Sequence, residues 1–254
     1  MTRPPEPGLS RRALLKAMAA APALAAAGCA SRRAPAIRTN RPTNVRVIEV
    51  NHDFEEYQYR APYQFGGRTV DHVTLLNVTC RVRTGGGVDS WGFGSMTLGN
   101  AWAFPAVPQD AGLGAMRALA GRLHVATADC REQGHPIDLF RALEPEYLRA
   151  AGELSRVRQL PVPIPKLCTL VVASAFDAAI HDAYGKAFGL SCYDTYGPRF
   201  ATRDLSHDLG PRFKGEYLDR YVPSAPRART PLFHSIGASD PLEAADVRVR
   251  IDDG

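Results

Sequence analysis

The chain has 254 residues, of which 45% are hydrophobic and 22% are charged, a composition typical of a globular protein with one or two domains. Its net charge is +5, but the first 29 residues hold four basic residues against one acidic residue. The rest of the chain is therefore close to neutral, and nucleic-acid binding is not indicated. No apolar run reaches the roughly 18 residues that a membrane-spanning helix needs.

The N-terminal residues predict an export signal. Ser10 to Lys16 reads SRRALLK, which resembles the twin-arginine motif S-R-R-x-F-L-K, and an alanine-rich apolar stretch follows. We therefore expect residues 1–29 to direct export to the periplasm. Gly28-Cys29 also fits lipoprotein processing, with Cys29 carrying the lipid of a membrane-anchored protein, whereas ordinary cleavage near Ala27 to Ala36 competes with it. Residues 30–44 are rich in Arg and Pro and predict a disordered tether.

The other four cysteines show no C-x-x-C spacing, so a zinc site or a dithiol redox site is not indicated. Cys80 and Cys168 stand on apolar patterns and predict buried core thiols. Export permits disulfide bonds, so a pairing of Cys130 stays open.

Three strands are predicted next. Val45 to Val50 and Val70 to Thr84 carry apolar residues with polar interruptions, and a third strand begins over Trp91 to Met96. Gly85-Gly86-Gly87 supplies the turn between the last two, which predicts a hairpin. Asn51 to Thr69 is rich in aromatic residues and is predicted to be a long loop.

Helical periodicity follows the strands. Ala111 to Thr127 and Ile137 to Leu154 each place leucines on one face, and Pro145 is expected to split or kink the second helix. A further helix is expected from about Lys166. Strands followed by helices indicate an α+β fold. His124 and His135 lack partners at metal-ligand spacing and are interpreted as surface or capping residues.

The segment from Ser174 to Gly197 is the most informative in the chain. Its apolar residues recur at steps of three and four, which predicts a helix, and Gly189 is its expected stop. The segment resembles the helix that links the capping domain to the barrel in the mandelate racemase/muconate lactonizing enzyme group of the enolase superfamily. Its pattern there is roughly S-A-x-D-x-A-L-W-D-x-x-G-K-x-x-G-x-P-x-Y-x-L-L-G. The matching residues are Ser174, Ala175, Asp177, Ala179, Asp182, Gly185, Lys186, Gly189, Tyr193 and Gly197.

The resemblance implies a fold for the rest of the chain. It implies an enolase-like capping domain over residues 45–165, with a three-stranded antiparallel sheet and a helical bundle, and a linking helix and connection over 166–197. Gly92-Phe93-Gly94-Ser95 stands where the family has G-W-G-E, so Ser95 replaces the usual Glu.

The resemblance also implies where substrate would bind. Two capping-domain loops of the family close over the active site and set substrate choice, and by position they are Phe54 to Thr69 and Ser95 to Pro105. The candidate substrate-binding residues on them are Tyr63, Phe65, Met96, Asn100 and Trp102. The alternative is that these side chains pack beneath their own loops.

The last part of the chain is expected to be the start of a barrel. Residues 198–230 predict an extended excursion. Within residues 231–254, Leu232 to Ile236 predicts a strand, and Asp240-Pro241 predicts the start of a helix that continues to Ile251. A complete (β/α)8 barrel takes about 250 residues, so only its first βα unit fits and the chain is expected to be truncated.

The resemblance implies Mg²⁺-assisted proton abstraction α to a carboxylate, with the metal ligands and the K-x-K base motif on barrel strands. No K-x-K occurs in the chain, so no catalytic or metal residue is assigned, and Asp177, His181 and Asp182 are interpreted as structural. The leading hypothesis is the N-terminal part of an exported racemase, epimerase or dehydratase, inactive as given, whose full-length form binds a small carboxylate and Mg²⁺ and is a homo-oligomer. The alternative is an exported, lipid-anchored binding or interaction module without catalysis.

Overall fold

The computed structural model describes residues 41–65, 67–222, 225, 227–233 and 241–247. The predicted export signal, Cys29 and residues 30–40 of the predicted tether lie outside the described residues.

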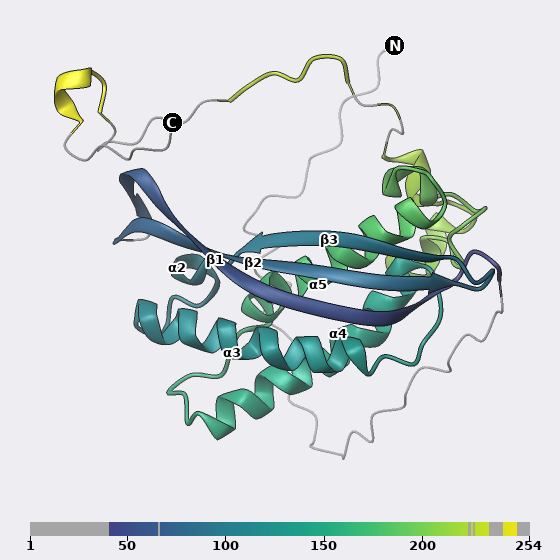
Figure 1. The fold of residues 1–254 in the computed structure, drawn as a ribbon, viewed down its shortest axis with the longest axis horizontal. Coiled ribbons are helices and arrows are strands. Elements are labelled where there is room, and N and C mark those ends of the chain that lie inside the picture. The colour runs from purple at the N-terminus through teal and green to yellow at the C-terminus, as the bar shows by residue number, and fades with distance from the viewer. Residues whose placement is uncertain (1–40, 66, 223–224, 226, 234–240, 248–254) are drawn as a thin grey trace, which may run out of the picture. The chain divides into compact units, whose positions relative to one another are not determined.

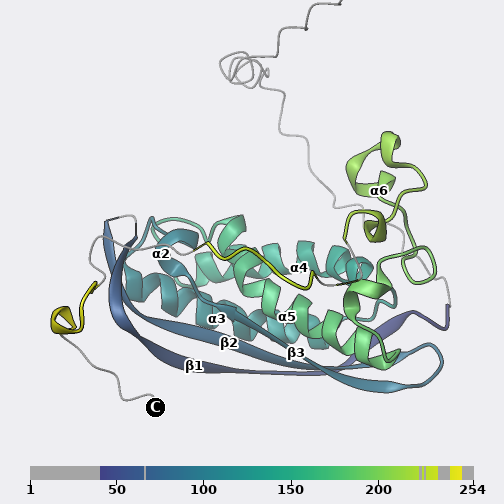
Figure 2. The same ribbon diagram turned by 90° about the horizontal axis from the view of Figure 1, so that it is seen from above.

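The described part of the chain forms an antiparallel sheet with helices on one face (Figures 1 and 2). Its strands are β1 (Val45–Phe65), β2 (Arg68–Thr84) and β3 (Asp89–Thr97), and they lie in the order β1-β2-β3. Leu76, Val78, Cys80 and Val82 alternate along β2 and are fully buried, which is the period of two expected of a strand with one covered face. The predicted α+β class with a three-stranded antiparallel sheet is confirmed.

The long loop predicted over Asn51 to Thr69 is wrong. This segment continues β1 and pairs with β2 from Asn51↔Thr79 to Gln58↔His72, and again from Tyr63↔Val70 to Phe65↔Arg68. Its aromatic residues are good strand formers because they cover the pleated surface of a sheet. A register shift between Gln58 and Tyr63 divides the hairpin into an inner and an outer part.

The strand β3 is followed by the helices α2 (Asn100–Ala103), α3 (Gln109–Ala128), α4 (Pro136–Val157) and α5 (Lys166–Ala187). Pro145 lies inside α4, which runs as one helix, so the expected split does not occur. The missing N–H of a proline costs one helical hydrogen bond. Leu143 and Tyr147, buried on either side of Pro145, secure both halves of α4 against the core.

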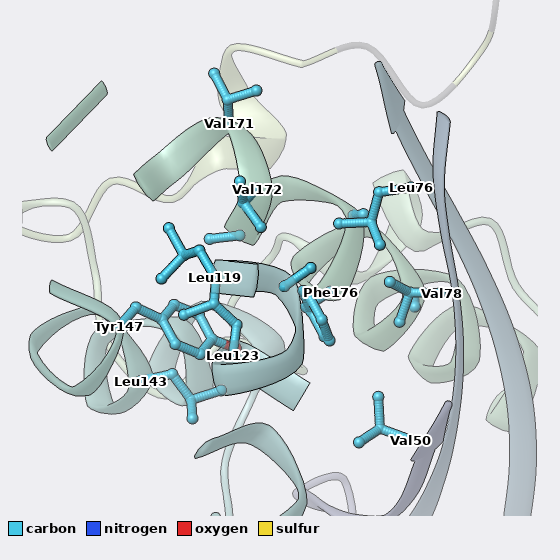
Figure 3. Close-up of a cluster of buried hydrophobic side chains, with 14 of the residues drawn as sticks. Val50, Leu76, Val78, Leu119, Leu123, Leu143, Tyr147, Val171, Val172 and Phe176 are labelled. Carbon is cyan, nitrogen blue, oxygen red and sulfur yellow. The ribbon is translucent and has the colours of Figure 1, made fainter. Parts of the chain in front are cut away.

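The core lies between the sheet and the helices (Figure 3). Leu76 and Val78 of β2 face Phe176 of α5, while Leu119 of α3 and Tyr147 of α4 close the other side. The Tyr147 hydroxyl is buried and lies 2.7 Å from Thr127 Oγ1, so its polar end is satisfied. Cys80 and Cys168 are buried free thiols in this core, as predicted, and Cys130 is also free.

Helix α5 packs unusually close to β3. A Cβ added at Gly94 would lie 2.6 Å from Ala179 N and 2.9 Å from Ala178 Cβ, and one at Gly92 would lie 2.8 Å from Ala183 Cα. Only glycine at these two positions lets the helix backbone rest directly on the strand.

Helix α5 is also the helix, among the described residues, that is long and apolar enough to cross a membrane. However, 61% of its most apolar window is buried inside the fold, so these side chains belong to the core. The helix is followed by Gly189 at φ 65°, the predicted stop.

The polar face of α5 is tied to the sheet. Asp182 Oδ2 accepts the backbone N–H of Phe93 on β3 at 2.8 Å and also pairs with Lys186 Nζ at 2.6 Å. His181 lies against Asp177, with Nδ1 3.0 Å from the Asp177 carbonyl oxygen. These contacts agree with the structural interpretation of the three polar residues.

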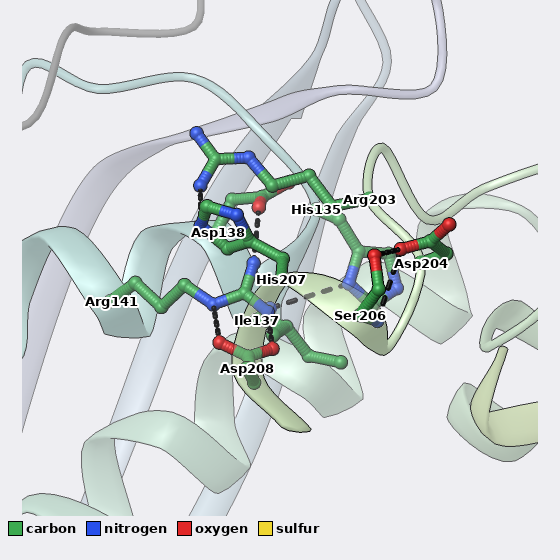
Figure 4. Close-up of polar contacts among 9 residues, drawn as sticks. All are labelled: His135, Ile137, Asp138, Arg141, Arg203, Asp204, Ser206, His207 and Asp208. Atoms are coloured by element: carbon green, nitrogen blue, oxygen red, sulfur yellow. Dashed lines mark hydrogen bonds and ion pairs between the residues drawn. The ribbon is translucent and has the colours of Figure 1, made fainter. Parts of the chain in front are cut away.

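Residues 198–222, which fall in the predicted excursion, hold short helical turns. These turns are α6 (Ser206–Leu209), η2 (Pro211–Phe213) and η3 (Leu218–Arg220), and η1 (Cys192–Thr195) precedes them. Arg141 of α4 joins them to the helices, because its guanidinium pairs with Asp208 on α6 and, at 3.0 Å, with Asp138 (Figure 4).

The βα unit expected over residues 231–254 does not form in the described part of that range. Leu232 and Phe233 are 96% and 101% exposed and lie outside any strand, and the single 3-10 turn is η4 (Ala244–Asp246). A strand needs a neighbour to pair its backbone groups, and the described chain offers none beside Leu232. Residues 234–240 and 248–254 of the expected strand and helix lie outside the described residues.

Candidate functional site

An open pocket lies where the outer part of the β1–β2 hairpin meets α2 and the start of α3. Of the five predicted substrate-binding residues, Tyr63, Asn100 and Trp102 line it together. Phe65 is exposed outside the lining, and Met96 packs against the hydrophobic core. Tyr59, His72 and Asp110 also line the pocket and were not predicted, because their proximity depends on the pairing of β1 with β2 and on how α3 begins beside the hairpin.

The α2 wall of the pocket is built around a glycine. A Cβ at Gly99 would overlap the indole of Trp102, so glycine there lets the ring lie over the backbone of its own turn. The buried Asn100 donates from Nδ2 to the carbonyl of Gln109 at 2.5 Å, which fixes the connection from α2 to α3. Trp102 remains 39% exposed and is available for contact.

The hairpin wall is fixed by an arginine. Arg68 donates from Nη2 to the carbonyl oxygens of Pro105 at 2.6 Å and Val107 at 3.1 Å, so the tip of the hairpin is clasped to the chain that follows α2. Tyr59 and Tyr63 pack edge to face with ring centroids 5.6 Å apart. The two predicted substrate segments are therefore held side by side.

Polar groups at the pocket can donate and accept hydrogen bonds. His72 lies 2.6 Å from Asp71, and this hydrogen bond lowers the pKa of the Asp71 carboxyl. Burial, and then the nearby Tyr63, raise the pKa of Tyr59, so its hydroxyl stays protonated near neutral pH. Amide, indole and hydroxyl donors suit recognition of a carboxylate or a polyol.

The pocket is an open depression rather than an enclosed cavity. Its volume is about 70 Å³, whereas pockets that enclose a ligand measure roughly 300–1,000 Å³. Among the described residues, no three His, Cys, Asp or Glu side chains converge to hold a metal ion. The residues present therefore do not fit a Mg²⁺ centre.

A second cleft lies between α4 and the turns around α6, and His135 is one of its lining residues. His135 caps the N-terminus of α4 as predicted, with Nδ1 accepting the N–H of Ile137 at 3.3 Å. It is only 1% exposed, so the surface interpretation is wrong. The cap brings the ring beneath the segment that follows α5, where Nε2 lies 3.2 Å from the carbonyl oxygen of Thr195.

No protein-family model and no curated protein matches the chain. Solved structures do resemble it. They include enolases and mandelate racemase/muconate lactonizing enzyme-like proteins. An enolase from Bradyrhizobium complexed with magnesium and mandelic acid is 14% identical, with 57% of this chain and 33% of that chain covered and a TM-score of 0.34.

Two further structures illustrate the range of these neighbours. One is L-talarate dehydratase from a Polaromonas species, complexed with Mg and L-glucarate. It is 17% identical, and the match covers 59% of this chain and 34% of that chain, with a TM-score of 0.32. A mandelate racemase/muconate lactonizing enzyme candidate from Roseovarius nubinhibens is 19% identical. The match covers 63% of this chain and 36% of that chain, with a TM-score of 0.34. The chain spans about a third of the length of the solved structures it matches.

Proposed function

We propose that the chain is the N-terminal, substrate-covering part of an exported enolase-superfamily enzyme that racemises, epimerises or dehydrates a small carboxylate. The observation that carries the proposal is the pocket at the hairpin. It brings Tyr63, Asn100 and Trp102 together from the two segments that the sequence resemblance identifies as substrate-covering. Export by the twin-arginine route, a lipid on Cys29 and assembly into a homo-oligomer are further parts of the proposal, supported by sequence alone.

The residues at the site indicate which steps this chain would perform and which it would not. The chain's own residues would bind and orient the substrate and exclude water from one side, through the Trp102 ring and the hydroxyl and amide groups beside it. Mg²⁺ would stabilise the enolate in the complete enzyme. Because the described residues do not fit a metal centre, the proton transfer is assigned to barrel elements outside them.

The test uses the two tryptophans of the chain as matched probes, because Trp102 lines the pocket and Trp91 does not. L-Glucarate and mandelate are titrated against the wild-type chain, Trp91→Phe and Trp102→Phe, with fluorescence as the readout. We expect weak, saturable quenching in the wild type and Trp91→Phe, and its loss in Trp102→Phe. No turnover is expected from residues 1–254 with Mg²⁺ present.

Each other result has a defined meaning. Tight binding without turnover would favour the alternative function, an exported and lipid-anchored binding module. Quenching that persists unchanged in Trp102→Phe would show that the pocket is not the site. Reproducible turnover by the 254-residue chain would contradict the assignment of the chemistry to barrel elements.

A further inference from the structure

We propose that His52 and His124 form a binding site for a borderline divalent cation such as Zn²⁺, Ni²⁺ or Cu²⁺, which joins β1 to α3. The two Nδ1 atoms lie 3.1 Å apart, although the residues are far apart in the sequence. Two nitrogens bound to one tetrahedral Zn²⁺ at about 2.0–2.1 Å lie roughly 3.3 Å from each other. The pair is therefore at the spacing that chelation of one ion requires.

Both histidines sit on rigid elements. His52 lies in the regular inner part of the hairpin, where it pairs with Val78, and His124 lies in the last turns of α3. Both side chains are half-buried, so the ring nitrogens are close to solvent but restricted in position. A site built on a strand and a helix needs little rearrangement to accept an ion.

Aromatic side chains surround the His52 ring. Phe54 contacts it edge-on with centroids 5.6 Å apart, and Phe176 of α5 lies 6.4 Å away on the core side. Apolar rings on these sides restrict rotation of the imidazole. They leave the Nδ1 atom directed at His124, with the ring centroids of the two histidines 5.1 Å apart.

The chemistry of the donors selects the ion. Imidazole nitrogen is a preferred ligand of Zn²⁺, Ni²⁺ and Cu²⁺, whereas Mg²⁺ prefers oxygen. Without an ion, one Nδ1–H donates to the other Nδ1. Binding requires both rings in the form protonated on Nε2, so the neutral pair exchanges a tautomer and loses no net proton. No third His, Cys, Asp or Glu joins them among the described residues, so water completes the coordination.

The site is separate from the proposed substrate pocket, whose lining includes neither histidine. An ion here would fasten the inner part of the hairpin to α3. The outer part of the same hairpin carries Tyr63 and the Arg68 clasp, so the ion would steady the base of that wall.

The test is isothermal titration of the metal-free 254-residue chain with ZnCl₂, with MgCl₂ as the hard-ion comparison. We compare the wild type with His52→Gln, His124→Gln and His72→Gln, the last being an exposed histidine paired with Asp71. We expect one Zn²⁺ per wild-type chain and no Mg²⁺. Either site variant should bind Zn²⁺ at least about tenfold more weakly, while His72→Gln binds it as the wild type does.

A measurement on the wild type keeps the test independent of variant folding. In nitrogen NMR spectra, Zn²⁺ should shift the imidazole Nδ1 resonances of two histidines and leave their Nε2 atoms protonated. Cu²⁺ should give an electron paramagnetic resonance spectrum with hyperfine coupling to two nitrogens. Absence of Zn²⁺ binding by the wild type would overturn the proposal. So would equal affinity of all four proteins, or resonance shifts confined to other histidines.

Discussion

At the scale of single residues, His135 shows how a buried position decides a protonation state. Its Nδ1 accepts from Ile137 and its Nε2 lies against the Thr195 carbonyl, which fits a neutral ring protonated on Nε2. Tyr184 covers the ring edge-on at 4.9 Å. Burial, and then the nearby His181, lower the pKa of His135 to about 3. A proton on Nδ1 would also face the N–H that now donates to it.

This lowered pKa predicts a loss of stability in acid. Below pH 6.5 the unfolded chain protonates His135 while the folded chain does not, so the free energy of unfolding falls as pH drops toward the folded pKa. His135→Asn keeps an N-cap acceptor but removes the titrating ring. We therefore expect a smaller loss of stability between pH 7 and pH 5 in the variant, measured by urea denaturation.

Two comparisons make the acid experiment decisive. His181 acts in the opposite direction, since its pKa is raised: burial alone would lower it, but the hydrogen bonds and charge of Asp177 outweigh burial. Its contribution is common to the wild type and the variant. His72→Asn, at an exposed site, should follow the wild type. A pH profile of His135→Asn that is parallel to the wild type would contradict the assignment.

At the scale of elements, the seam between β3 and α5 depends on the absence of side chains. Gly92 and Gly94 leave room for the helix backbone, while the neighbouring Trp91 and Phe93 point to the other face and are half exposed. A helix that sits this close cannot move away without opening the core along its length, because α5 also contacts β2, α3 and α4.

The seam predicts opposite effects for two glycine substitutions. Gly94→Ala would place a Cβ 2.6 Å from Ala179 N, so it should lower the free energy of unfolding by about 1–3 kcal/mol or more. Gly152→Ala on α4 meets nothing within 4 Å and should raise it by about 1 kcal/mol, since alanine is the better helix former. Urea denaturation of both variants checks the pair. An unchanged free energy of unfolding in Gly94→Ala would show that α5 and β3 can separate enough to admit a methyl group.

At the scale of the whole described chain, a single core joins the sheet to the helices. The buried cluster includes residues of β1, β2, α3, α4 and α5, with Met96 of β3 packed against it, and Phe200 extends it toward the turns around α6. Trp102 packs beside the hairpin on α2, away from the centre of this cluster, and so reports on the edge of the fold.

A shared core predicts one cooperative unfolding transition. In Trp91→Phe, fluorescence reports on Trp102 alone, while far-ultraviolet circular dichroism reports on the helices. The two signals should have the same thermal midpoint, because the Arg68 clasp and the Asn100 hydrogen bond couple the pocket to the sheet and to α3. A lower midpoint temperature for the fluorescence signal than for circular dichroism would mean that the pocket wall unfolds independently.

Much of this fold could be predicted from periodicity. The apolar alternation around Val78 and the three- and four-residue steps through Phe176 report which face of each element is buried, and that information is local. The hairpin beyond Asn51 could not be predicted this way. Its two edges are mostly exposed, so its side chains carry no strong apolar alternation, and its existence depends on pairing with residues of β2.

The candidate site was predicted only in part for the same reason. Trp102 and Asn100 could be assigned by position after β3, but His72 could be placed in the pocket only with the pairing of β1 to β2 beyond Asn51, which the sequence does not show. The proximity of His52 and His124 depends on how α3 lies across β1. Contacts between distant segments arise from packing, which spacing along the chain does not encode.

The hydrogen bond from Phe93 to Asp182 has a consequence for how the molecule meets other copies of itself. β3 is an edge strand, and its unpaired N–H groups are a template on which a strand from another chain could grow. Asp182 occupies one of these groups, and its negative charge, with Lys186 beside it, stands where an incoming backbone would have to lie. A strand added at this edge would therefore have to displace the Asp182 carboxylate from the Phe93 N–H before it could pair there.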